Sequence, residues 1–164
     1  MPLPADLMES LAAMPDRVEA VMRSVPASRL DWTPASWEAV PGEMFSARGQ
    51  ICHLRDIEVL GYHRRIQRLR DEAEPDLDSL DSYELGERLD YEAADADAAM
   101  RDFRAARQAT LDLLAPLTEA QLERAGTFAE YGRLSLRGLV HLLASHDAQH
   151  LACLHWLLAK MSAA

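Results

Sequence analysis

The chain has 164 residues, of which 49% are hydrophobic and 27% are charged, and this length and composition fit one compact domain spanning residues 1–164. Its formal net charge of −10 repels phosphate backbones, which excludes nucleic acid as an expected partner. The uncharged stretches are shorter than a membrane span and the first residues do not resemble a signal peptide, so we expect a cytoplasmic protein with no membrane partner.

Long segments rich in strong helix formers lie between a small number of prolines, and no sustained alternation of β-branched residues interrupts them. We therefore predict an all-α protein. Pro15 is expected to kink or restart the first helix, and Thr118 opens a short helix with the pattern of a capping box. In chain order, the predicted helices cover residues 6–25, 43–72, 82–114 or 86–114, a short segment from 118, and 135–160.

The connectors between these helices are long. Residues 26–42 contain prolines together with Trp32 and Trp37, which predicts an ordered loop, whereas residues 71–82 are acidic and turn-like. Residues 126–133 contain two glycines and are predicted to form a loop. Four long amphipathic helices without an internal repeat predict a four-helix bundle with long loops, in which functional sites are built from inward-facing side chains.

Motifs of several common enzyme classes are missing from the chain. It has no phosphate-binding loop, no dinucleotide fingerprint, no nucleophile elbow and no H-E-x-x-H zinc motif. A di-iron bundle needs two Glu-x-x-His motifs, and the nearest approach is a single Asp147 three residues before His150. The acidic residues 76–81 lack the glycine of a calcium-binding loop. The histidines are therefore the residues that remain to be explained.

Four of the six histidines lie in the last predicted helix. At about 100° per residue, His150 falls within a stripe of leucines and His146 lies at its edge, whereas His141 and His155 point to the opposite side. Two rings spaced by four residues can reach one metal ion, and a metal satisfies ring nitrogens that are costly to bury. The alternative, that both rings are only hydrogen-bonded within the core, remains equally open at this point.

A bundle-core metal site needs a third ligand from another helix. His53 shares a face with Ile57 and Leu60 in the second predicted helix, so it is the best-placed candidate. His63 lies among arginines and is expected to face solvent. From spacing alone, His53 is also compatible with an ordinary hydrogen-bonded position in the core.

Two segments of the chain resemble the DinB-like (YfiT/DinB) superfamily. Residues 45–58, FSARGQICHLRDIE, are similar to its second-helix signature, with the core His-Leu-x-Asp-x-Glu, and residues 136–151 are similar to its final helix with a His-x-x-x-His pair. Residues 107–114 and 121–126 add to the resemblance, which covers most of the chain from residue 32 onward. Family members often carry Gln shortly after the last ligand, where this chain instead has residues 151–154, LACL, including Cys153.

The resemblance implies a divalent metal, zinc or nickel, held by His53, His146 and His150 at one end of the bundle. It also implies a metal-dependent enzyme acting on a small-molecule substrate, either a hydrolase or a transferase or isomerase that uses a low-molecular-weight thiol. The alternative is a non-catalytic metal-binding bundle that serves stress response or partner binding. We expect a homodimer, because bundles of this family commonly pair and the chain has three tryptophans.

Other residues near the predicted ligands have two interpretations each. Asp147 could orient a ligand ring, act as a base, or be a surface acid at the open end of the bundle, and we favour a place beside the ligands or at that end. Arg48 or Arg55 could bind a substrate carboxylate, or only pair with neighbouring acids. The substrate pocket is expected at the bundle end, between the second and last helices and the connector 26–42.

Overall fold

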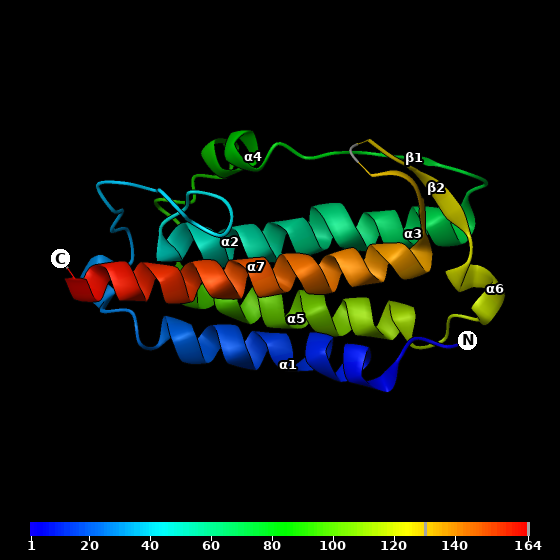
Figure 1. Ribbon diagram of the computed structural model, residues 1–164, viewed down its shortest axis with the longest axis horizontal. Helices are drawn as coiled ribbons and strands as arrows, with labels where there is room; N and C mark the ends of the chain where they lie inside the picture. The colour runs from blue at the N-terminus through cyan, green and yellow to red at the C-terminus, as the bar shows by residue number, and fades with distance from the viewer. Residues whose placement is uncertain (130, 164) are drawn as a thin grey trace.

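The computed structural model describes residues 1–129 and 131–163. Four helical rods lie side by side in it, which confirms the predicted four-helix bundle (Figure 1). One rod is a continuous run of three helical segments, in which a π-helical turn joins two α-helices. The rods are α1 (Ala5–Met22), α2–η2–α3 (Ala47–Asp56, Ile57–His63 and Arg64–Asp71), α5 (Ala96–Leu114) and α7 (Leu136–Ala163).

The order of the rods around the bundle follows from their contacts. Both α2 and α1 pack against α5 and α7, so that α2 and α1 occupy opposite corners. Helices α1 and α7 run in one direction while α2–α3 and α5 run in the other, as the colour gradient along each rod shows (Figure 1). Pro15, where a kink or restart was predicted, lies inside α1. This helix is a single element and ends at Met22 rather than at the predicted residue 25.

The second rod begins four residues later than predicted. The Ser46 side chain caps α2 by accepting a hydrogen bond from the Gly49 backbone N–H at 3.2 Å, which satisfies one of the free donors at the helix start. A helical start at residue 43 is therefore wrong, because the cap fixes the boundary at Ala47. Residues 43–45 leave the helix and lie across the bundle, which brings Glu43 toward the neighbouring helices.

The third predicted helix is two separate helices, α4 (Ser82–Arg88) and α5. Asp81 caps α4 and Asp95 caps α5, each by accepting hydrogen bonds from two backbone N–H groups. Asp90 between them has a φ of 49°, in the left-handed region, which reverses the chain. The apolar spacing continues through this turn, and for that reason the prediction of one helix was wrong here.

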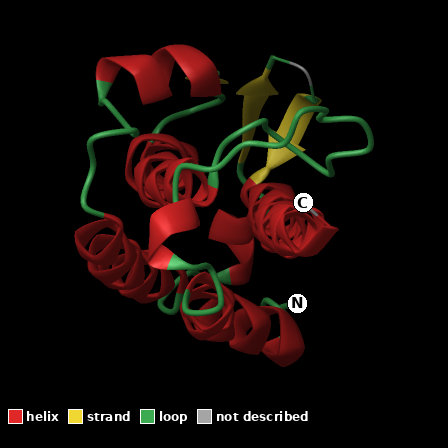
Figure 2. Ribbon diagram, turned by 90° about the vertical axis from the view of Figure 1, so that its left-hand side faces the viewer, coloured by secondary structure: helices red, strands yellow, loops and turns green. Residues whose placement is uncertain are grey.

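A three-stranded sheet is the main departure from the all-α prediction. It consists of β1 (Asp76–Leu77), β2 (Ala125–Phe128) and β3 (Gly132–Ser135), with β1 parallel to β2 and β2 antiparallel to β3. The loop predicted at residues 126–133 is thus part of a hairpin. The strands are too short for an alternating pattern to stand out. The sheet and α4 lie on the same side of the bundle (Figure 2).

Two further short helices connect these elements, η1 (Ala27–Arg29) and α6 (Glu119–Leu122). The capping box predicted at Thr118 is confirmed at the start of α6, where the Thr118 and Gln121 side chains bond reciprocally to backbone groups. No helix in the two described stretches has the length and apolar character needed to cross a membrane.

The core consists of two apolar clusters with polar side chains between them. One cluster contains Phe103 and Leu157, and the other contains Leu69 and Leu139. The leucine stripe predicted along the last helix is confirmed, because its members are fully buried at Leu136, Leu139, Leu143, Leu154 and Leu157. Between the clusters lie buried polar groups from several rods, namely Gln50, His53, Glu58, Arg107, Asp147 and His150.

Candidate metal centre

Three histidine rings converge between α2 and α7. The Nε2 atom of His146 lies 3.1 Å from the Nε2 of His53 and 3.1 Å from the Nε2 of His150. Helical spacing brings His146 and His150 onto one face of α7, and the packing of α2 against α7 brings His53 to them. The structure therefore gathers the three histidines that the sequence singles out.

A carboxylate that the sequence analysis missed lies beside the rings. The Oε2 atom of Glu43 is 3.4 Å from the Nε2 of His150, and its Oε1 atom is 3.9 Å from the Nε2 of His53. Together with the rings it forms a group whose potential ligand atoms all lie within 4.8 Å of one another. The missed signal is Ser46, whose capping role would have taken Glu43 out of the helix and freed it to reach the rings.

Gln50 determines which nitrogen of His150 is free. The Gln50 side-chain Nε2 donates to the backbone carbonyl of Glu43 at 2.9 Å, so its Oε1 is the atom that faces the His150 Nδ1 at 2.5 Å. An amide oxygen only accepts, and therefore the His150 Nδ1 carries the proton. The neutral His150 ring then presents the lone pair of Nε2 to the centre, which is the form that binds a metal.

All three rings are neutral at physiological pH. Burial lowers the pKa of His53 to about 3, with a further contribution from His150, and lowers the pKa of His150 to about 4. Burial also lowers the pKa of His146 well below its ordinary value, and the neighbouring rings and the guanidinium groups of Arg107 and Arg65 act in the same direction. Neutral imidazole is the protonation state that coordinates divalent ions.

The arrangement fits a transition-metal ion. Two nitrogens bound about 2.0–2.1 Å from one tetrahedral ion are separated by roughly 3.3–3.4 Å, slightly more than the 3.1 Å spacings found here. The Oε2 of Glu43 and the Nδ1 atoms of His53 and His146 are buried without a hydrogen-bond partner among the described residues. Imidazole nitrogens suit a divalent transition metal better than calcium or magnesium, which prefer all-oxygen sites.

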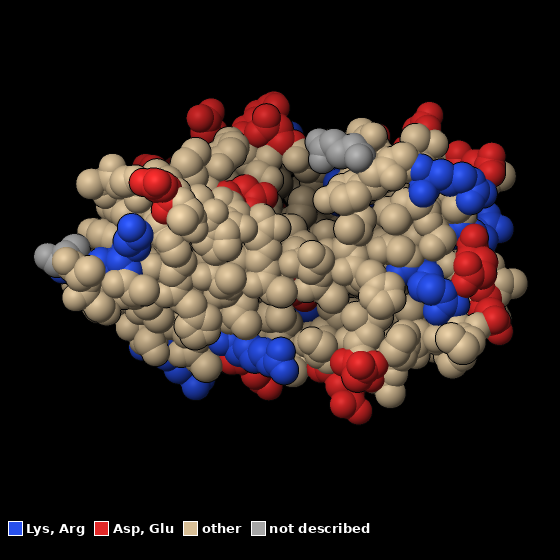
Figure 3. Space-filling view, viewed as in Figure 1, with Lys and Arg blue, Asp and Glu red and all other residues tan. Residues whose placement is uncertain are grey.

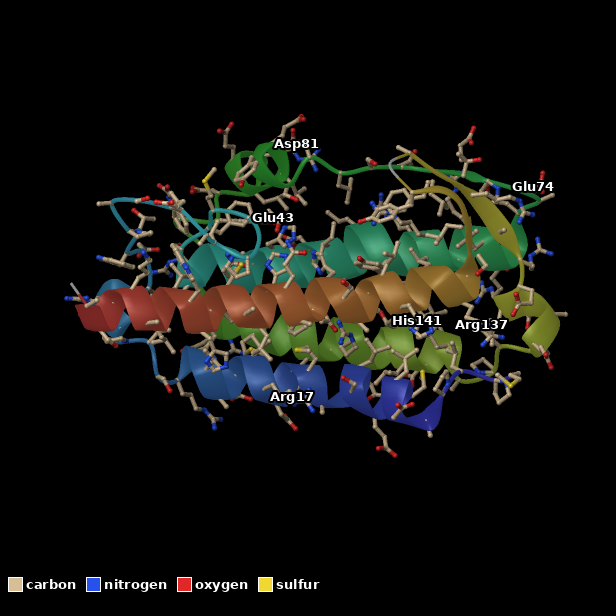
Figure 4. All side chains as sticks on the ribbon, in the orientation of Figure 1. Arg17, Glu43, Glu74, Asp81, Arg137 and His141 are labelled. Carbon is tan, nitrogen blue, oxygen red and sulfur yellow. The ribbon has the colours of Figure 1, made fainter. Side chains whose placement is uncertain are left out.

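The predicted place at one end of the bundle is wrong. His146 and His150 lie near the middle of the 28-residue helix α7, between the two apolar clusters. Residues 43–45 and the segment around α4 cover the bundle on the side of these histidines. Glu43 lies on this covered side of α7, whereas His141 lies on its other side (Figure 4).

A pocket of about 140 Å³ opens beside His53, His146 and Glu43. Its other walls include Tyr62 from η2 and Phe128 from β2. Figure 3 shows the molecule hollowed on this side. None of the three tryptophans is among the residues that line the pocket. Trp37 instead stacks on Trp156, with ring centroids 5.8 Å apart. The tryptophan-bearing connector 26–42 therefore does not form the pocket wall.

The homodimer expected from the sequence stays a prediction.

The carboxylate of Asp147 is hydrogen-bonded to the buried side chain of Arg107. Both of its carboxylate oxygens accept hydrogen bonds from Arg107, at 2.7 and 2.9 Å, and its side chain is only 1% exposed. The interpretation as a surface acid at an open end is therefore wrong. Burial raises the pKa of Asp147 to about 6, although the charge and hydrogen bonds of Arg107 oppose the shift. Asp147 lies next to the ligand candidate His146 in the chain, with its carboxylate held by Arg107.

The remaining predicted residues lie away from the centre. His141 and His155 are exposed, as the helical projection predicted, and His63 is partly buried. Arg48 binds the carboxylate of Asp31 and Arg55 binds that of Asp56, which favours their interpretation as ordinary ion pairs. Cys52 and Cys153 are buried free thiols, and burial raises the pKa of each to about 11.

The chain matches the family model of the DinB superfamily over residues 10–154. Its structure is similar to that of YfiT from Bacillus subtilis, which is described as a probable metal-dependent hydrolase with an unusual four-helix bundle topology. The two structures align with a TM-score of 0.83 at 21% sequence identity, over 96% of this chain and 86% of that chain. This likeness establishes the fold. No curated protein matches the chain.

Proposed function

The chain belongs to the DinB superfamily, and on this premise we propose that it is a metal-dependent hydrolase acting on a small-molecule substrate. The observation that carries the proposal is the convergence of three neutral imidazoles on one point beside a pocket. Three protein nitrogens leave a coordination position for water or substrate, as in catalytic metal sites. The description of YfiT as a probable metal-dependent hydrolase supports the same activity here.

His53, His146 and His150 would hold a zinc or nickel ion through their Nε2 atoms. The ion would supply Lewis acidity, which polarises a substrate carbonyl and lowers the pKa of water. The Gln50 amide keeps the proton of His150 on Nδ1 and thereby keeps its Nε2 available. The two apolar clusters on either side of the rings exclude bulk water and hold the ring positions.

Glu43 would serve as the general base. Its carboxylate lines the pocket, and its Oε2 atom is buried and free of hydrogen bonds to the described residues. That oxygen lies 3.4 Å from the Nε2 of His150, so a water between the centre and the pocket would be within its hydrogen-bonding reach. Glu43 accepts a proton from this water as the water attacks the substrate carbonyl, and it later returns the proton to the leaving group.

The first test measures metal content and hydrolysis together. We expect about one zinc or nickel ion per chain by elemental analysis, and activity on a panel of small esters and amides. His150→Ala is expected to lose both the ion and the activity, whereas the exposed control His141→Ala keeps both. Wild-type protein that binds no zinc or nickel after incubation with either ion would overturn the metal site.

The variant Glu43→Gln distinguishes a role of Glu43 as general base from a role as metal ligand. This variant keeps the size of the side chain, so we expect unchanged metal content and a loss of about 10²–10⁴-fold in kcat. Loss of the ion in Glu43→Gln would instead make Glu43 a ligand and contradict its role as a base. The same panel includes transfer and isomerisation reactions that depend on a low-molecular-weight thiol. Turnover only with thiol would contradict the hydrolase, and an inactive metal-loaded protein would favour a metal-stabilised binding bundle.

A further inference from the structure

Arg65, at the start of α3, is a buried arginine in the wall of the metal-site pocket. Its side chain is 6% exposed, and it lines the pocket together with His146 and Glu43. Its Nε and Nη2 atoms both donate to the backbone carbonyl of Asp78, at 3.0 and 2.7 Å. Its guanidinium also lies 4.5 Å from the centre of the Phe128 ring. These contacts fix the group in one orientation.

The charge of Arg65 has no carboxylate partner among residues 1–129 and 131–163. The carboxylate of Asp78 lies instead 3.5 Å from Arg68, and only the carbonyl of Asp78 contacts Arg65. Arg107, the other buried arginine, is paired with two carboxylates. An unpaired buried charge is costly, and burial accordingly lowers the pKa of Arg65.

Part of the Arg65 guanidinium is free to bind. Of its five N–H groups, the one on Nε and one on Nη2 are used by the Asp78 carbonyl. The groups on Nη1 and the second on Nη2 have no acceptor in the described part of the chain. These two nitrogens form the edge of the fork that accepts a carboxylate in two parallel hydrogen bonds.

We propose that Arg65 binds the carboxylate of the substrate, so that the enzyme acts on small esters or amides of carboxylic acids that carry a second, free carboxylate. This inference rests on the proposed hydrolase function. The free carboxylate pairs with the Arg65 guanidinium while the scissile carbonyl lies beside the three histidines. Leu80 and Leu142 contribute apolar surface to the wall of the same pocket.

The pocket volume limits the size of this substrate. The volume is about 140 Å³, and liquid water occupies about 30 Å³ per molecule, so the enclosed part of the ligand is only a few non-hydrogen atoms long. A short dicarboxylic acid esterified or amidated at one end has the required size and charge.

The small sheet and a glycine build this binding position. Asp78 directly follows β1 and Phe128 ends β2, so the pairing of these strands holds both contacts of Arg65 in place. Gly61, one turn earlier in the same rod, faces the guanidinium. A Cβ atom at residue 61 would lie 3.0 Å from the Nη1 of Arg65, and glycine leaves this nitrogen room.

A matched pair of esters tests the proposal. Monomethyl succinate carries a free carboxylate, and dimethyl succinate is the neutral equivalent. Wild type is expected to prefer the monoester by at least tenfold in kcat/KM, and Arg65→Gln is expected to lose this preference while keeping its metal content. Arg65→Lys keeps the charge but not the fork and should retain a partial preference. The exposed neighbour provides the control, Arg64→Gln, which should behave as wild type.

Binding of succinate provides a readout that does not depend on turnover. Calorimetry on metal-loaded and metal-free protein should show at least tenfold weaker succinate binding to Arg65→Gln than to wild type and Arg64→Gln. Circular dichroism establishes whether each variant is folded. If Arg65→Gln is unfolded, Arg65→Lys replaces it in the binding comparison. Equal succinate affinity and equal ester preference in folded Arg65 variants would overturn the inference. If wild type cleaves neither ester but binds succinate through Arg65, the hydrolase fails and the anion site stands.

Discussion

The guanidinium of Arg107 connects all four rods of the bundle. From α5 it donates to both carboxylate oxygens of Glu58 in η2, to both of Asp147 in α7, and to the backbone carbonyl of Leu11 in α1, at 2.7 to 2.9 Å. All five N–H groups of the side chain are thereby used. The two acids leave the cluster with a net negative charge, which makes the cation essential to burying them. Such networks contribute less to net stability than their contacts suggest, but they are costly to break.

Arg107→Met should therefore be strongly destabilising. The substitution leaves the carboxylates of Glu58 and Asp147 buried without a cation, and we expect a loss of about 3–5 kcal/mol in the free energy of unfolding. Denaturant unfolding measures this loss. Arg104→Met, on the exposed side of the same helix, removes ion pairs with Asp16 and Glu19 and should cost less than about 1 kcal/mol. Equal costs for the two variants would contradict the role assigned to Arg107.

Within the connector that precedes α2, close packing on α7 sets the position of Glu43. A Cβ atom at residue 42 would lie 2.7 Å from the Nε2 of Gln149, 2.9 Å from its Cγ and 3.0 Å from the Sγ of Cys153. A side chain at residue 42 would therefore have to displace the Gln149 side chain and press on the Cys153 sulfur, whereas glycine lets the backbone lie against α7 without this displacement. The adjacent Glu43 thereby reaches the rings, and its carbonyl accepts the hydrogen bond from Gln50.

Gly42→Val should consequently impair the centre without removing it. The added side chain pushes the connector away from α7 and withdraws the Glu43 carboxylate, while the three histidines stay on their helices. We expect metal content to stay near one ion per chain and kcat to fall at least tenfold. Ala35→Val, at an exposed position of the same connector, is the matched control and should keep wild-type activity. Full activity in Gly42→Val would show that the connector does not position Glu43.

The elements explain which parts of this site are predictable from sequence. The convergence of His146 and His150 follows from helical periodicity over a long segment, and the apolar face of the second helix already made His53 the best-placed third candidate, which the resemblance to the DinB-like family then implied to be a ligand. Glu43 was assigned to a helix because the apolar pattern of residues 43–72 was followed from its first residue, without the capping signal of Ser46. Arg65 lies in an arginine-rich turn that resembles a solvated face, and only the pairing of β1 with β2, which is set by tertiary contacts, places it in a pocket.

In the whole molecule, the buried histidines couple folding to pH. Burial lowers the pKa of His53 to about 3 and that of His150 to about 4 in the metal-free fold. The pKa of His146 is lowered as well. In the unfolded chain these rings titrate near pH 6.5. Between about pH 6.5 and 4 the unfolded state therefore binds protons that the native state does not, and the stability they contribute is lost as the pH falls.

Asp147 acts in the opposite direction over part of this range. Its folded-state pKa of about 6 lies above its ordinary value of 3.8, so the native state binds the extra proton between these values. The contribution of this one carboxyl group to the pH dependence of stability opposes the contributions of the three imidazole rings. Each group changes the free energy of unfolding by up to about 1.4 kcal/mol per pH unit. The three rings therefore outweigh the single acid, and the net effect of these four groups is a loss of stability on acidification.

We therefore expect the chelator-treated protein to lose several kcal/mol of unfolding free energy between pH 6.5 and 4.5, measured by denaturant unfolding at half-unit steps. Removing one buried ring isolates its share from the titration of surface carboxylates. His53→Phe should have a shallower pH dependence than wild type, by up to about 1.4 kcal/mol per pH unit, whereas the exposed His141→Phe should have the same slope as wild type. A wild-type slope that His53→Phe leaves unchanged would mean that His53 takes up its proton as readily in the fold as in the unfolded chain, and that the three rings are not held neutral by burial.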